Sequence, residues 1–255
     1  MHRFFVEPEA IARNTVTIIG PQARQMEEVL RLRPGDSIIV LDNSGWQYEV
    51  EIADLDEARA TGTVKGKSLV TTEPQTKITV FQGLLKGERF EYVLQKGTEL
   101  GVVGFVPVVC ERCVVGQIRE ASSGKWQRWQ RIVAEAAEQS ERGKLPMLRP
   151  AVMFQQACEN VRGFSVLAWE REQAVGLRNT LRHRLQQAPK GKKPGRLFSL
   201  NLFVGPEGGF TPEEVQRARG YGIVPVSLGP RILRADTATI VATTAIMYEL
   251  GDLGD

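Results

Sequence analysis

Residues 202–214 read LFVGPEGGFTPEE, and this stretch holds the end of a strand, a glycine-rich turn and the start of a helix. The apolar run Leu200–Val204 has the length of a buried strand. Thr211 is the expected N-cap, Pro212 takes the first helical position, and Glu214 completes a capping box. A strand followed at once by a helix is the building unit of a parallel sheet, so the stretch predicts an α/β fold.

The chain from Ile78 onward repeats this alternation of strand and helix. The expected strands are Ile78–Gln82, Phe105–Val109, Ser165–Trp169, Leu200–Val204 and Val224–Leu228. The expected helices are Glu88–Leu100, Lys125–Glu141, Ala174–Gln187, Thr211–Arg219 and Asp236–Leu250. Such alternation predicts a mostly parallel sheet with helices on both faces.

The first 70 residues follow a different pattern, in which short β-rich runs are separated by turns. The expected strands are Arg3–Val6, Thr15–Ile19, Ser37–Leu41, Trp46–Ile52 and Ala60–Lys65. The turn Asp42–Gly45 predicts a hairpin, and Gln22–Leu32 has a helical pattern. Many short strands with one helix predict a small β-barrel. The polar segment Thr71–Lys77 is the expected linker, which predicts domains at residues 1–72 and 73–255.

The composition is that of a globular protein. Of the 255 residues, 42% are hydrophobic and 25% are charged, which excludes a disordered chain, a coiled coil and a collagen-like repeat. The longest uncharged run, Thr237–Tyr248, has twelve residues, too few to span a bilayer. Residues 1–8 lack the apolar core of a secretory leader. We expect an unsecreted, cytoplasmic protein with no membrane partner.

Three cysteines, an odd number, favour a reducing compartment over a disulfide framework. Cys110 and Cys113 form a C-x-x-C motif, but a structural zinc site needs about four ligands. The histidines, His2 and His183, lie far away in the sequence, and valine-rich runs flank the motif on both sides. We therefore expect no metal, and structural roles for this pair and for Cys158.

The net charge of +3 is unevenly distributed. Residues 1–74 carry eight basic and twelve acidic side chains, whereas Arg171–Arg196 alone carries eight basic side chains and one acid. The stretch Lys125–Arg131 (KWQRWQR) interleaves tryptophans with cations. These basic stretches suit a polyanion, with tryptophan stacking on an unpaired base. The alternative is a solvated helix face, with Trp126 and Trp129 packing inward.

A second loop, Gly229–Ala235, follows the expected strand Val224–Leu228, and Asp236 is the expected N-cap of the final helix. That helix is small or apolar nearly all round, which indicates burial or a subunit interface. Loops at the carboxyl ends of consecutive parallel strands are expected to face one pocket. The glycines match neither a P-loop nor the G-x-G-x-x-G pattern of dinucleotide sites.

The chain resembles the RsmE-type methyltransferases. The resemblance rests on four segments in family order: QKGTELGV (95–102), EAAEQSER (135–142), LFVGPEGGFTPEE (202–214) and SLGPRILRADTA (227–238). It extends over the whole chain, including HRFFV (2–6) and VLRLRPGD (29–36). Members of this bacterial family use S-adenosylmethionine to methylate N3 of a uridine in 16S ribosomal RNA of the small subunit.

The resemblance implies a SPOUT α/β knot, in which the last strands and helix form a deep trefoil knot, a rare exception to unknotted topology. It also implies a PUA-like N-terminal β-barrel that assists RNA binding, and a homodimer with the final helix near the interface. The expected partner is 16S rRNA or the small ribosomal subunit. Position 236 is Asp where the family more often has Glu.

The resemblance also assigns residues. The implied S-adenosylmethionine contacts are Phe203, Val204, Gly205, Gly208, Gly209, Leu228, Gly229, Ile232, Leu233, Arg234 and Thr237. For RNA binding we name Arg3, Arg31, Arg33, Lys125 and Arg128.

Uracil N3 carries a proton that must leave, and a cation near O2 or O4 stabilises the developing uridine anion. Because N3 lies on the base-pairing edge, the target has to be unpaired or flipped out. We expect Arg234 to supply this cation, with Arg231 in the same loop. Glu207, Gln139 and Arg142 are further candidates for base contact or proton removal, with a structural role as the alternative for each.

Two alternative functions stay open. One is methylation of another RNA target, such as a ribose 2′-hydroxyl or a tRNA base. The other is an RNA-binding assembly factor without catalysis, built on the N-terminal barrel.

Overall fold

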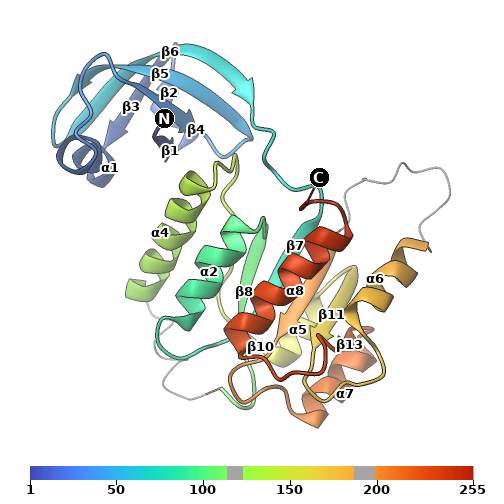
Figure 1. Cartoon of the computed structure of the whole chain (residues 1–255). Helices are drawn as coiled ribbons and strands as arrows, with labels where there is room; N and C mark the ends of the chain where they lie inside the picture. Colours follow the sequence, from blue (N-terminus) through green and yellow to red (C-terminus); the bar gives the residue numbers. More distant parts are fainter. Residues whose placement is uncertain (114–122, 187–198, 255) are drawn as a thin grey trace. The chain divides into compact units, whose positions relative to one another are not determined.

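The computed structural model describes residues 1–113, 123–186 and 199–254. It divides into two compact units, which are described separately (Figure 1). The first unit comprises Met1–Glu73 with Ala134–Leu145, and the second comprises Pro74–Val133 with Pro146–Asp255. The end of the predicted helix Ala174–Gln187 and the last part of the basic stretch Arg171–Arg196 lie outside the described residues.

The first unit is built on a curled mixed sheet with the strand order β1-β4-β5-β6-β3-β2. Its strands are β1 (Arg3–Phe5), β2 (Ile11–Ala12), β3 (Thr15–Ile19), β4 (Ser37–Leu41), β5 (Trp46–Leu55) and β6 (Arg59–Leu69). Strand β1 pairs in parallel with β4, and the other pairs are antiparallel. The strand pattern predicts a small β-barrel, and the sheet curls into a half-barrel, in which the described residues show no pairing between β1 and β2.

Local sequence explains the turns of this unit. Asp42 accepts hydrogen bonds from the Ser44 amide, at 3.0 Å, and from the Tyr48 hydroxyl, which confirms the predicted hairpin between β4 and β5. The predicted helix Gln22–Leu32 is shorter, since α1 (Pro21–Arg24) continues as the π-helical turn η2 (Gln25–Val29) and then stops. A short 3-10 turn, η1, precedes β2 at Pro8–Ala10.

The second unit contains a parallel sheet with the order β10-β8-β7-β12-β11-β13, and β9 pairs with β8. Its strands are β7 (Lys77–Gly83), β8 (Gly104–Val109), β9 (Met147–Leu148), β10 (Val152–Met153), β11 (Phe164–Ala168), β12 (Ser199–Val204) and β13 (Val224–Val226). The helices are α2 (Arg89–Glu99), α4 (Ser123–Gln139), α5 (Phe154–Asn160), α6 (Leu177–Gln186), α7 (Pro212–Gly220) and α8 (Ala235–Glu249). The last turns of α4 belong to the first unit.

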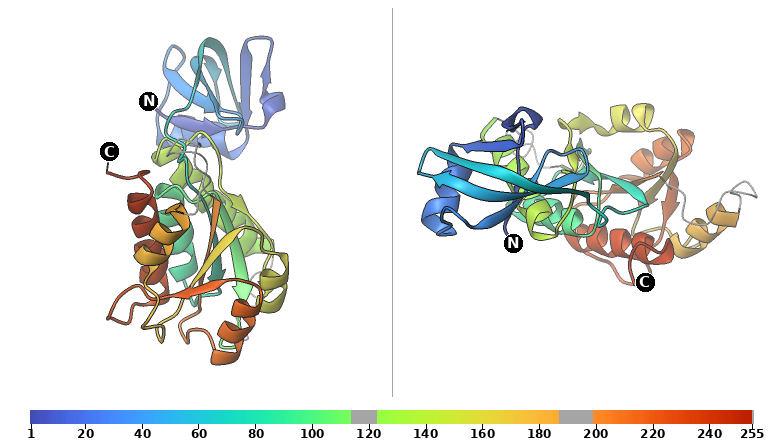
Figure 2. Two further views of the ribbon diagram at one scale, coloured as in Figure 1. Left: turned by 90° about the vertical axis from the view of Figure 1, so that its right-hand side faces the viewer. Right: turned by 90° about the horizontal axis from the view of Figure 1, so that it is seen from above.

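Helices cover both faces of this sheet, as the alternation of strands and helices predicts (Figure 2). One face packs against α2, α6, α8 and the tryptophan-bearing part of α4, through residues such as Phe90, Leu181 and Ile246. The other face packs against α5 and α7, through Phe154 and Val215. Alternate residues of each strand point to opposite faces, so both layers are apolar and the sheet is buried between them.

The α/β class of the second unit is confirmed, and the differences are three short elements that were not predicted and shifts at the ends of others. Helix α5 and strands β9 and β10 are absent from the sequence prediction. The N-cap of α8 is Arg234, so Asp236 stands in the first turn instead of capping the helix. Among the described residues, no helix combines the length and apolar composition needed to cross a bilayer. The trefoil knot stays a prediction.

Candidate active site

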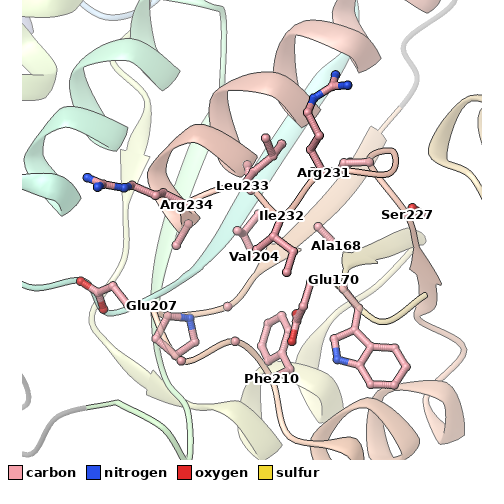
Figure 3. Close-up of a pocket in the computed structure, with 18 of the residues that line it drawn as sticks. Ala168, Glu170, Val204, Glu207, Phe210, Ser227, Arg231, Ile232, Leu233 and Arg234 are labelled. Atoms are coloured by element: carbon pink, nitrogen blue, oxygen red, sulfur yellow. The ribbon is translucent and has the colours of Figure 1, made fainter. Parts of the chain in front are cut away.

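A pocket opens at the carboxyl ends of β11, β12 and β13, where the loops after these three strands meet (Figure 3). This edge is where parallel sheets bind ligands. The pocket is lined by Arg89, Ala168, Trp169, Glu170, Val204, Gly205, Pro206, Glu207, Gly208, Gly209, Phe210, Ser227, Leu228, Gly229, Arg231, Ile232, Leu233, Arg234, Ala235 and Ala238. The two glycine-containing loops thus face one pocket, as predicted.

The loop after β12 is held by its own backbone and by the start of α7. Gly209 has a φ of +67°, and a side chain at Gly83, beneath the loop, would lie 2.5 Å from the Pro206 nitrogen. The predicted capping box is present, because Thr211 Oγ1 accepts from the Glu214 amide at 3.2 Å and Glu214 Oε2 accepts from the Thr211 amide at 2.9 Å. Glycines here bring the backbone close to any ligand.

Glu207 is anchored at one side of the pocket. Its Oε1 accepts a hydrogen bond from the Lys86 amide at 2.8 Å and lies 3.7 Å from the Arg89 guanidinium. These contacts come from the segment between β7 and α2. The carboxylate is therefore fixed in place while it lines the pocket.

The loop after β13 supplies cations and apolar side chains. Arg231 and Arg234 both line the pocket, and neither forms an ion pair with another described residue. In Figure 3, Arg234 extends toward the side of Glu207 and Arg231 extends away from it. Ile232 is 84% exposed. The N-terminus of α8 also faces this pocket, so its helix dipole adds positive potential there.

The third wall of the pocket, Ala168–Glu170, follows β11, and no motif of the sequence pointed to it. A side chain at Gly209 would meet the Glu170 carboxylate at 2.9 Å, so this carboxylate lies directly over the glycine turn. The Trp169 indole nitrogen is buried with no hydrogen-bond partner among the described residues. Strand β11 lies between β12 and β13 in the sheet, and only this strand order places its loop in the site.

Some predicted contact residues are not part of the pocket lining. Phe203 points to the opposite face of the sheet, where its ring stacks on Phe81 at a centroid distance of 4.4 Å. Thr237 lies on the exposed side of α8. Strand periodicity explains the first case, because Val204 and Phe203 necessarily face opposite layers.

Gln139 and Arg142 belong to the first unit and do not line the pocket. Arg142 is 3% exposed and forms an ion pair with Glu73, with Nη2 and Oε2 3.0 Å apart. Glu73 also accepts from the amides of Gly143 and Lys144, and Arg142 together with these amides holds the pKa of its carboxyl below the usual value despite burial. This buried ion pair favours a structural role for Arg142 over contact with the target base.

The residues predicted to bind RNA lie in different environments. Arg31 and Arg33 are exposed, and Lys125 is half-buried. Arg3 is only 12% exposed and contacts Glu141 and Gln47. Arg128 is 2.6 Å from Glu91.

The tryptophans of α4 pack inward. Trp129 is buried and its ring lies 4.5 Å from that of Phe90, while Trp126 packs against the same core. Of the two interpretations of the KWQRWQR stretch, the structure supports the packed helix face rather than base stacking by tryptophan.

The cysteine pair adjoins the β12 loop through its neighbours. Arg112 donates to the Gly208 carbonyl at 2.7 Å, and the Glu111 amide donates to Glu214 at 2.9 Å. The Cys110 amide donates to Cys113 Sγ at 3.2 Å. Cys158 belongs to α5 and is buried in the core that this helix forms with α7 and the sheet. Within the described residues, no three His, Cys, Asp or Glu side chains are grouped to hold a metal ion.

Residues 71–247 match the model of an RNA methyltransferase domain. The ribosomal RNA small subunit methyltransferase E of Bacillus subtilis is 33% identical over 254 residues, which cover 98% of this chain and 97% of that protein.

Solved structures agree with this match. Ribosomal RNA small subunit methyltransferase E from Neisseria gonorrhoeae, bound to S-adenosyl methionine, is 28% identical with a TM-score of 0.81, covering 97% of both chains. A Legionella pneumophila protein solved with bound SAM is 27% identical with a TM-score of 0.82, covering 96% of both chains. The chain therefore belongs to the ribosomal RNA small subunit methyltransferase E family, the RsmE family of RNA methyltransferases.

Proposed function

We propose that this chain uses S-adenosylmethionine to methylate N3 of a uridine in 16S ribosomal RNA. The observation that carries the proposal is the pocket at the ends of β11, β12 and β13, where a glycine turn, three arginines and two carboxylates converge. The relatives named above, one of them bound to S-adenosyl methionine, support the choice of cofactor and RNA.

The residues present fit this cofactor. S-adenosylmethionine carries two positive centres and several hydrogen-bond acceptors. The Glu170 carboxylate over the glycine turn suits a positive centre, and the unpartnered Trp169 N–H needs an acceptor. Val204, Gly205 and Leu233 offer backbone groups and apolar surface for the remainder.

The chemistry is a displacement at a methyl carbon, for which bound S-adenosylmethionine supplies the electrophilic methyl group. The protein's contribution is to position the uracil and to stabilise charge. We infer that Arg234 lies beside O2 or O4 of the uracil and stabilises the anion that forms when the N3 proton leaves. Glu207, held by Lys86 and Arg89, is our candidate for accepting that proton. We assign Arg231, at the opposite rim of the pocket, to a contact with RNA.

We propose supporting roles for the remaining surfaces. The half-barrel of residues 1–72 assists RNA binding through exposed cations such as Arg31 and Arg33, and residues 73–255 carry the methyltransferase. Four exposed residues form a stripe along α8: Thr237, Val241, Ala245 and Tyr248. Tyr248 is 69% exposed. This stripe supports a homodimer through α8. A ribosomal substrate further implies that the protein works in the cytoplasm.

The test is mass spectrometry of nucleosides after incubation of unmodified small-subunit RNA, free and assembled, with the protein and S-adenosylmethionine. We expect 3-methyluridine as the product. A methyl group on another nucleoside or on a ribose would instead show a different RNA target. No product together with no cofactor binding in calorimetry would refute the enzyme assignment and favour an assembly factor.

The variant Arg234→Ala tests the catalytic assignment. Loss of a cation beside the developing anion is expected to lower the rate about 10² to 10³-fold. The fold, measured by circular dichroism and thermal unfolding, is expected to stay unchanged. Arg217→Ala, which removes an exposed arginine of α7 outside the pocket, is the matched control and is expected to retain the wild-type rate. Full activity of Arg234→Ala would overturn the role.

A further inference from the structure

A buried hydrogen-bond bridge lies behind the pocket wall, between β7 and α8. Gln82 of β7 and Thr239 of α8 are both fully buried. The Thr239 hydroxyl donates to Gln82 Oε1. Gln82 Nε2 donates to the carbonyl of Gly205, with a nitrogen–oxygen distance of 3.2 Å, and to that of Gly83, at 3.1 Å. One side chain therefore ties the last helix to the first glycine of the β12 loop.

The bridge joins two walls of the pocket. Gln82 is the register partner of Val204, so its amide lies beside the point where β12 ends and the loop begins. Val204 and Gly205 line the pocket from that side. On the other side Ala238, the residue before Thr239, lines the pocket from α8. The hydrogen bonds thus set the spacing between the glycine loop and the helix.

A second threonine on α8 shows that burial alone does not explain the bridge. Thr243 lies one turn beyond Thr239 and is equally buried, but its hydroxyl has no hydrogen-bond partner among the described residues. The two positions therefore share residue type, helix and burial, and they differ in the contact with Gln82. Thr239 Oγ1 also lies 3.0 Å from the Ala235 carbonyl within the helix, a contact that does not reach the loop.

We propose that Gln82 and Thr239 are positioning residues that hold the glycine loop and α8 in the cofactor-binding arrangement before the cofactor arrives. A pocket fixed in advance binds more tightly, because its walls lose less conformational freedom on binding. A buried hydrogen bond in a site shielded from water is strong enough for this purpose. The inference rests on the proposed function for the identity of the ligand, S-adenosylmethionine.

The test compares Thr239→Val with Thr243→Val, which remove the same hydroxyl from the same helix. For Thr239→Val we expect the Kd for S-adenosylmethionine, measured by calorimetry, to rise about tenfold. We also expect faster amide hydrogen exchange at residues 205–210 in the ligand-free protein. Thr243→Val is expected to match the wild type in both measurements. Thr239→Ser, which keeps the hydroxyl, is expected to restore both.

Kinetics separate positioning from a general loss of structure. With Thr239→Val we expect KM for the cofactor to rise while kcat changes less than twofold, since the bound cofactor itself orders the walls. Equal effects of the two valine variants, or no effect of Thr239→Val on exchange at residues 205–210, would overturn the proposal. If wild-type protein fails to bind S-adenosylmethionine, the proposed function falls, and the exchange comparison still decides whether the bridge orders the loop.

Discussion

At the scale of single residues, Cys113 shows how a short turn changes the chemistry of a side chain. Its thiolate accepts from the Cys110 thiol and from the Cys110 amide, and these hydrogen bonds lower the pKa of Cys113 to about 7 despite burial. Burial raises the pKa of Cys158 to about 12, and the pKa of Cys110 is raised by its contact with Cys113 and by burial. The three cysteines therefore differ sharply in nucleophilicity.

We expect alkylation of Cys113 by iodoacetamide to accelerate between pH 6 and 8, since half of its thiol is ionised near pH 7. Cys158 is expected to stay unlabelled over this range. Peptide mass spectrometry after timed labelling measures both rates. In Cys110→Ala the thiol donor is absent, so the pH at which Cys113 reaches half its maximal rate is expected to rise. Labelling of Cys113 that begins only above pH 9 would contradict this.

At the scale of elements, the start of α7 combines a cap with a contact to the loop that follows β8. Thr211 Oγ1 accepts from the Glu214 amide and also donates to Glu111 Oε2 at 3.2 Å. Glu214 is 4% exposed and accepts from the Glu111 amide. The helix start therefore also fixes the loop that follows β8.

We expect Thr211→Ala to lower the free energy of unfolding by about 1 kcal/mol, the usual cost of a lost N-cap. Urea denaturation followed by circular dichroism measures this change. Thr211→Ser keeps the acceptor oxygen and is expected to lie within a few tenths of a kcal/mol of the wild type. Equal destabilisation by both substitutions would show that the methyl group, rather than the cap, stabilises this helix.

Local signals account for what the sequence predicted correctly. The capping box, the DNSG hairpin and the alternation of strands and helices depend on neighbouring residues, and each appears in the structure. The contribution of Glu170 depends on the insertion of β11 between β12 and β13, which no local pattern encodes. Similarly, the burial of Arg142 follows from its contact with Glu73, far away in the sequence.

The capping prediction at Asp236 was wrong for a related reason. Helix α8 begins at Ala235, two residues before the start that an Asp236 cap requires, and Arg234 takes the N-cap position through its backbone. The Asp236 side chain then lies in the first turn of α8, where its negative charge interacts favourably with the helix dipole and stabilises the helix. The residue types therefore predicted where α8 begins to within two residues, but the N-cap position depends on the packing of the folded chain.

At the scale of the whole molecule, the pH dependence of stability reflects a partly buried carboxyl. Burial is the main reason that the pKa of Glu138 rises to about 7, while the Phe5 amide, which donates to its Oε1 at 3.2 Å, opposes the shift. Between the unfolded pKa of 4.5 and about 7, the folded state binds more protons than the unfolded state. The contribution of Glu138 to stability is therefore lost as pH rises through this window.

Glu138→Gln keeps the acceptor oxygen and removes the charge. We expect it to stabilise the first unit by about 1 kcal/mol at pH 8, a value reduced for partial solvent exposure, and to have little effect at pH 5. Urea unfolding at the two pH values measures the difference. Glu9→Gln, at an exposed position of the same unit, is the control and is expected to be neutral at both. A gain at pH 5 equal to that at pH 8 would contradict the titration.

The order of the pocket loops along the chain has a consequence for biosynthesis. Apart from Arg89, the lining residues fall between Ala168 and Ala238, and the α8 wall comes last. A nascent chain leaving the ribosome presents the complete half-barrel strands β1–β6 and the strands β7 and β8 long before the three loops can meet. Cofactor binding therefore arises only after α8 has been synthesised, because a translation product interrupted before this helix lacks one wall of the pocket.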